Sequence, residues 1–181
     1  GENDIMIAVK SGKAIRFPES KVRPMGRTAS GVRGIWMEDD DEAIGMVCVE
    51  PNNANILVVS ENGFGKRSAI EDYRITNRGG KGVKTINMTE KTGNLIALID
   101  VTDEDNLMII NRSGLTIRLE VSSLRVMGRN TQGVKLINLR NEDSIAAVAK
   151  VSAAKDEENS EVVAEEERGE AEPNGQSEEN V

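Results

Sequence analysis

A period of 51 residues runs through most of this chain and constrains its fold more than any other feature. Two residue types mark the period: Arg27, Arg78 and Arg129 recur at this spacing, as do Gly31, Gly82 and Gly133. A period of about 50 residues is typical of solenoids and propellers, in which each copy forms the same small unit. The sequence therefore predicts three structural copies in a row.

Each copy contains short apolar segments that read as strands. The first segments, 4–9, 55–60 and 106–111, are followed by turns at Gly12, Gly63 and Gly114, which predicts a hairpin at the start of every copy. The third strands, predicted at 32–35, 83–86 and 134–137, alternate apolar with cationic or small residues, as half-buried strands do. The fourth strands are predicted at 44–49, 95–101 and 145–151. No segment sustains a helical period, so the pattern indicates an all-β fold.

Four short strands per copy, repeated head to tail, favour a propeller-like fold with blades at about 4–54, 55–105 and 106–151. A single blade would expose both faces of its sheet, so stacking between blades must supply the core. Three blades are too few for a closed ring of about four to eight. Either the chain belongs to a larger propeller, or its end blades have flanks that pair with something else.

The charge of the chain is concentrated at one end. The net charge is -8, but residues 153–181 hold 11 acidic residues against Lys155 and Arg168, a balance of -9, which leaves +1 for residues 1–152. From residue 152 onward the strand pattern stops, and the composition is too polar to bury an apolar core. We predict that residues 152–181 form a disordered acidic tail.

Few residues could support catalysis or cofactor binding. There is no histidine, and the single cysteine, Cys48, lies in an apolar run that we interpret as core. The acidic run at 38–42 lacks the spacing of a calcium loop, so we interpret it as a solvated turn. We therefore expect no catalytic residue, no metal and no cofactor. No apolar run approaches the length of a membrane span, and we expect a cytoplasmic protein that does not contact a membrane.

Cations gather in one half of each copy, on the second strand, on the glycine-containing arc after it and at the start of the third strand. Stacked blades would join these groups into a basic track suited to the phosphates of duplex DNA. Single-stranded binders need aromatic stacking platforms, which are scarce here. Solvation of exposed loops is the alternative explanation of these charges. The candidate phosphate contacts are Arg16, Arg27, Arg33, Arg67, Arg74, Arg78, Lys81, Lys84, Arg118, Arg129 and Lys135.

The arc at 77–83 is the most basic and glycine-rich of the three. Three glycines, at positions 79, 80 and 82, leave the backbone free of Cβ groups beside Arg78 and Lys81, so this turn can approach an anionic surface closely. We expect Arg78 and Lys81 to be the strongest phosphate contacts, supported by Arg27 and Arg129. A nucleotide phosphate loop is the alternative, but the spacing of that motif is missing.

Residues 78–82, R-G-G-K-G, match the last five positions of the motif Q-[RK]-R-G-G-[RK]-G. With the repeat pattern of residues 4–151, this motif resembles the C-terminal domain of bacterial DNA gyrase A, whereas Thr76 and Asn77 depart from it. The resemblance implies a β-pinwheel, usually of six four-stranded blades, of which this chain would hold the last three and an acidic tail that regulates wrapping. It also implies a non-catalytic module that wraps duplex DNA for ATP-dependent negative supercoiling.

The same resemblance implies partners and location: double-stranded DNA, the remainder of the gyrase A polypeptide, and gyrase B in an A2B2 assembly near the nucleoid. Two alternatives stay open. One is the equivalent C-terminal DNA-binding domain of topoisomerase IV, and the other is a propeller that binds proteins.

Overall fold

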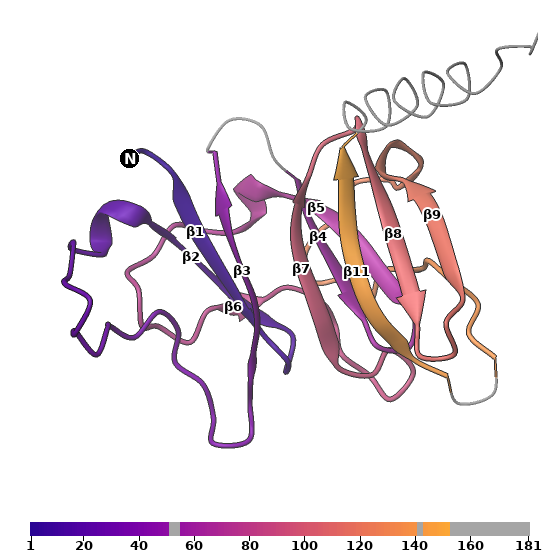
Figure 1. The fold of residues 1–181 in the computed structure, drawn as a ribbon, viewed down its shortest axis with the longest axis horizontal. Coiled ribbons are helices and arrows are strands. Elements are labelled where there is room, and N and C mark those ends of the chain that lie inside the picture. The colour runs from indigo at the N-terminus through magenta and orange to yellow at the C-terminus, as the bar shows by residue number, and fades with distance from the viewer. Residues whose placement is uncertain (51–54, 141–142, 153–181) are drawn as a thin grey trace, which may run out of the picture.

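The computed structural model describes residues 1–50, 55–140 and 143–152, and these form three antiparallel β-sheets side by side (Figure 1). The first sheet has the order β3 (Ala43–Val49), β1 (Asp4–Val9), β2 (Lys13–Pro18), β6 (Val83–Lys84). The second has the order β10 (Val134–Lys135), β5 (Phe64–Ala69), β4 (Asn55–Ser60), β7 (Leu95–Val101). The third has the order β11 (Ile145–Ser152), β8 (Asp105–Asn111), β9 (Thr116–Glu120). The predicted all-β fold class is confirmed.

Besides the strands, the described part of the chain contains three short 3-10 helices. Single-turn 3-10 helices follow the second strand of each repeat: η1 (Glu19–Lys21), η2 (Ile70–Asp72) and η3 (Val121–Ser123). Within the described ranges, no helix has the length and apolar character needed to cross a membrane. The predicted acidic tail lies outside the described residues, apart from Ser152 at the end of β11.

The three predicted hairpins are confirmed. β1 pairs with β2, β4 with β5, and β8 with β9, all antiparallel. The glycines of the turns, Gly12, Gly63 and Gly114, have φ angles of 83°, 83° and 87°, which L-residues with a Cβ rarely adopt. The recurrent glycine therefore sets the turn geometry of each repeat.

The third strand of a repeat pairs with the sheet of the repeat before it. Val83 lies opposite Ala14 and Lys84 opposite Lys13, so β6 of the second repeat completes the first sheet. β10 completes the second sheet by pairing with β5 in the same way. The strand predicted at residues 32–35 does not form, because no described strand precedes the first repeat to pair with it. β9 likewise has no outer partner among the described residues.

Stacking of the sheets creates the core, as predicted. Alternate residues of β4 point to opposite sides: Ile56 and Val58 are buried against the first sheet, and Leu57 and Val59 against the third. This double burial explains why residues 56–59 of β4 are apolar without interruption. The central sheet thus has no solvent-exposed face, and each neighbour depends on it for one buried face.

The interpretation of Cys48 as a core residue was wrong. Cys48 is exposed, and so is Met46, at 66% of its reference surface. Both lie on β3 opposite Ile5 and Ile7, on the face that points away from the second sheet. That face packs against no described sheet, so apolar sequence here does not mean burial.

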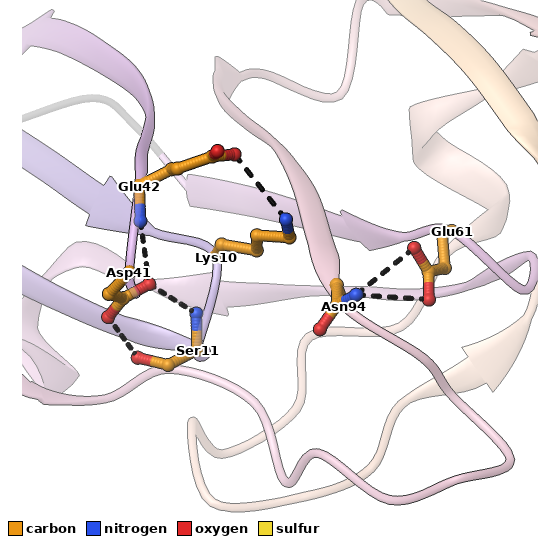
Figure 2. Close-up of polar contacts among 6 residues, drawn as sticks. All are labelled: Lys10, Ser11, Asp41, Glu42, Glu61 and Asn94. Carbon is orange, nitrogen blue, oxygen red and sulfur yellow. Dashed lines mark hydrogen bonds and ion pairs between the residues drawn. The ribbon is translucent and has the colours of Figure 1, made fainter. Parts of the chain in front are cut away.

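Polar contacts brace the turns at one end of the sheets (Figure 2). Ser11 donates to Asp41 from its amide at 3.0 Å and from its hydroxyl at 2.6 Å, which ties the first hairpin to the acidic turn. Burial alone would raise the pKa of Asp41, but these bonds and the amide of Glu42 outweigh it and lower the pKa below its usual value. In the second repeat, Asn94 donates to both carboxylate oxygens of Glu61 at 3.3 Å.

Candidate nucleic-acid interface

The three sheets have an inner edge, where they pack together, and an outer edge. The position of the basic segments is described relative to these two edges. β3 packs against β7, and β7 against β11, so these strands form the inner edge of the row. β6 and β10 lie at the opposite edge of their sheets. We call this outer edge the rim; it includes the arcs before these strands, residues 75–82 and 126–133. Five of the predicted phosphate contacts lie on these strands and arcs: Arg78, Lys81, Lys84, Arg129 and Lys135.

The backbone of the second arc is bonded to the first repeat. The Gly79 amide donates to the Gly34 carbonyl at 2.6 Å, and the Trp36 amide donates to the Gly80 carbonyl at 2.9 Å. The Asn87 amide bonds to the third arc in the same way. The arcs are thus structural joints between repeats as well as exposed turns.

The recurrent arc glycine is required by a close approach of two backbones. Gly82 has a φ angle of 70°, and a Cβ there would lie 2.5 Å from the carbonyl oxygen of Ala14. Gly133 has the same relation to the carbonyl oxygen of Gly65. Gly31 has a similar φ angle but open space around it, because nothing described packs on the first arc. Gly82 and Gly133 therefore allow the arc to pack closely against the backbone of the preceding repeat.

The recurrent arc arginines reach across the same joints. Arg78 is half-buried and donates to the carbonyl oxygens of Lys21 at 3.1 Å and Arg33 at 3.2 Å. Arg129 donates to the carbonyl oxygen of Lys84 at 2.9 Å. A guanidinium has five N–H donors, so these bonds use only part of its capacity. Both arginines fasten the repeats together at the rim while their charge stays near its surface.

Two of the predicted phosphate contacts lie inside the molecule. Arg16 is only 7% exposed and donates to the carboxylate of Asp4 at 2.7 Å and to the carbonyl oxygen of Ile70 at 2.8 Å. Arg67 is equally buried and pairs with Asp103. The backbone of each also bridges to the arc of the following repeat, at Ile75 and Val126. Because both side chains are buried, they are not part of the proposed interface. Arg118, the third member of this series, is exposed on β9.

Lys66 is a buried cation whose role the sequence does not reveal. Its side chain is 1% exposed, and its Nζ donates to the carbonyl oxygen of Gly128 at 2.7 Å. Burial lowers the pKa of Lys66 to about 8, and the nearby charges of Asp72 and Arg129 act in opposite directions. The equivalent residues in the other repeats are Ile15 and Ile117, and only this mismatch in the repeat could have marked Lys66.

The remaining predicted contacts lie on the surface. Lys81 stands over the ring of Trp36, with its Nζ 4.7 Å from the ring centroid. Lys84 on β6 is next to Lys13 on β2. The other exposed members are Arg27, Arg33, Arg74 and Lys135. Lys84 and Lys135 occupy equivalent positions on the outer strands of successive sheets, so exposed cations recur along the rim.

Three stacked antiparallel sheets, two of them completed by a strand from the following repeat, define a propeller-like β-pinwheel. The sequence model of the family described as "DNA gyrase C-terminal domain, beta-propeller" matches residues 3–50, 54–102 and 105–152. The chain belongs to this family.

Relatives and solved structures agree with this placement. The DNA gyrase A protein of Staphylococcus aureus strain MRSA252 is 47% identical over 160 residues, which cover 88% of this chain but 18% of that protein. A structure of a DNA gyrase A C-terminal domain has a TM-score of 0.75 at 25% identity, over 82% of this chain and 50% of that one. The C-terminal domain of a DNA topoisomerase IV shares the fold, with a TM-score of 0.82 at 20% identity over 92% of this chain and 52% of that one.

Proposed function

We propose that this chain binds duplex DNA through its phosphates along the rim and serves as a non-catalytic DNA-wrapping module of DNA gyrase A. The observation that carries the proposal is the recurrence of cations at the rim: Arg78 and Arg129 on the arcs, and Lys84 and Lys135 on the outer strands of successive sheets. Phosphate contacts of this kind give affinity without reading sequence. The residues assigned to DNA are Arg27, Arg33, Arg74, Arg78, Lys81, Lys84, Arg118, Arg129 and Lys135.

The assignment to gyrase rests on the relatives. This chain spans 18% of the length of the S. aureus protein, and the proposal assigns catalysis to the rest of the enzyme. In this proposal the partners are duplex DNA, the remainder of the gyrase A polypeptide, and gyrase B in an A2B2 assembly that supercoils DNA with ATP in the cytoplasm, at the nucleoid. The chain itself uses no cofactor and contacts no membrane.

A topoisomerase IV domain is the second candidate, favoured by the similarity of fold. The 47% identity to a gyrase A protein weighs against it. The handedness of supercoiling by the full-length protein separates the two. Introduction of negative supercoils supports gyrase, and relaxation alone supports topoisomerase IV.

Direct binding measurements test the proposed activity. Fluorescence anisotropy should show that this chain binds two unrelated duplexes of about 40 bp with similar affinity, since the contacts are to phosphates. A single strand of the same length should bind more weakly, because aromatic stacking platforms are scarce. A strong preference for one sequence, or for the single strand, would contradict the proposal.

A further inference from the structure

A cavity of about 240 Å³ opens on the rim where the second arc meets the first hairpin. It is lined by Ser11, Gly12, Lys13, Lys81, Gly82 and Lys84, together with the apolar residues Ile86 and Met88. Three lysines thus line the cavity from three segments: the start of β2, the arc, and β6. A water molecule takes up about 30 Å³ in the liquid, so the cavity has room for a tetrahedral anion and some of its water.

The cavity has positive charge without a matching negative charge in its wall. None of its lining residues is acidic. The Nζ of Lys13 lies 3.5 Å from a carboxylate oxygen of Glu38, but both side chains are substantially exposed, and such surface pairs contribute little. The Nζ of Lys84 has a neutral partner, the side-chain oxygen of Asn87, at 3.5 Å.

The strand register makes this arrangement unfavourable without an anion. Lys13 and Lys84 are direct partners across β2 and β6. Like charges at opposite positions on neighbouring strands destabilise a sheet. An anion between the two ammonium groups and Lys81 would turn this repulsion into attraction.

The same backbone joint occurs between the second and third repeats, but with different charge. The residues equivalent to Lys13, Lys81 and Lys84 are Phe64, Gln132 and Lys135. Their register is the same, since Lys135 pairs with Phe64 on β10 and β5. Only one of these three side chains is cationic, so the two joints differ in charge while sharing a backbone geometry.

We propose that the pocket of Lys13, Lys81 and Lys84 binds one backbone phosphate of duplex DNA and is the main anchor of the duplex on this chain. The second joint contributes a weaker contact through Lys135. This inference rests on the proposed function, because the duplex must already lie along the rim. It adds Lys13 to the interface and predicts that the two joints contribute unequally.

The test compares two triple variants that remove the same charge. The pocket variant is Lys13→Gln, Lys81→Gln and Lys84→Gln; the control, from around the second joint, is Lys91→Gln, Arg125→Gln and Lys135→Gln. We expect the pocket variant to bind a duplex of about 40 bp at least tenfold more weakly than the control, because hydrogen bonds to charged groups are among the stronger ones. Circular dichroism melts verify that both variants fold.

Inorganic phosphate tests the pocket without DNA. In ¹H–¹⁵N spectra recorded at constant ionic strength, phosphate should shift the amide signals of Gly12 and Gly82 in the wild type but not in the pocket variant. Equal loss of duplex binding in both triple variants would overturn the anchor and leave the proposed function intact. A wild-type chain that binds no duplex would overturn both. Phosphate shifts with unchanged duplex binding in the pocket variant would show an anion site that is not a DNA anchor.

Discussion

Arg16 and Lys66 are buried cations, and the partners that offset the loss of hydration differ between them. Arg16 has a buried carboxylate, Asp4, at 2.6 Å from one of its terminal nitrogens, as well as carbonyl partners in the second repeat. Lys66 donates to a single carbonyl, that of Gly128. Arg16 therefore links β1, β2 and the next repeat, whereas Lys66 links β5 to the third arc.

Arg16→Met should destabilise the fold strongly. The substitution leaves Asp4, which is 4% exposed, buried without its counterion, and breaking a buried pair in this way costs about 3–5 kcal/mol. Urea unfolding followed by circular dichroism measures the change. Arg27→Met is the control, since Arg27 is exposed and its loss should change stability by less than about 0.5 kcal/mol. Equal effects of the two substitutions would contradict the structural role of Arg16.

Lys66 should make stability rise with pH in the weakly alkaline range. Its pKa is about 8 in the folded chain and 10.5 when unfolded, so between these values the unfolded state binds more protons and stability increases with pH. From pH 7.5 to 9.5 the gain should be about 2 kcal/mol. Lys66→Ile, which restores the residue of the other repeats, should lack this gain. Measurements stay below pH 10 because burial raises the pKa of Tyr73, whose ionisation would destabilise the fold at higher pH.

At the scale of elements, the joint between repeats is the feature that the sequence does not reveal. The hairpins follow from local apolar patterns and turn glycines, and their predicted bounds are nearly correct. The alternating pattern predicts a strand at Val83 and Lys84, but not its pairing with Lys13 and Ala14, which joins distant parts of the chain. For the same reason the sequence could not distinguish buried Arg16 from exposed Lys84, since both belong to alternating strand patterns.

Comparing Gly82→Ala with Gly31→Ala should separate two losses of stability. One comes from the positive φ angle, and the other from the close contact between the arc and β2. Both glycines have positive φ angles, so each substitution costs about 1 kcal/mol for that conformation. At Gly82 the new Cβ would also meet the Ala14 carbonyl oxygen at 2.5 Å, which should add about 1–3 kcal/mol. Thermal unfolding of the two variants measures the difference. If Gly31→Ala were as destabilising as Gly82→Ala, the close approach would not matter.

At the scale of the whole molecule, charge separates into two regions. Residues 1–152 carry +1, and residues 153–181 carry -9. A tethered acidic segment competes with phosphate at high effective concentration. Bending a site of 20–30 bp costs about 1–6 kcal/mol, and three sheets offer few contacts to offset it. We expect this chain to bind duplex DNA with little bending.

Removal of residues 153–181 should tighten duplex binding. The truncated chain loses its net negative charge and the competitor for the rim, so its dissociation constant should fall and depend more steeply on salt. Anisotropy titrations of the full and truncated chains at equal ionic strength measure this effect. Unchanged affinity after truncation would exclude the tail as a regulator of the rim.

The salt dependence of duplex binding tests the central claim most directly. If the rim binds phosphates, the logarithm of the binding constant should fall linearly with the logarithm of salt concentration, by about 0.9 for each phosphate neutralised. Lys81→Gln, Lys84→Gln and Lys135→Gln together should make this slope less negative by up to about 1.8, because Lys81 and Lys84 share one phosphate, whereas Arg16, which is buried, should not contribute to it. Binding that is insensitive to salt, or a slope unchanged in the triple variant, would contradict a phosphate-binding rim.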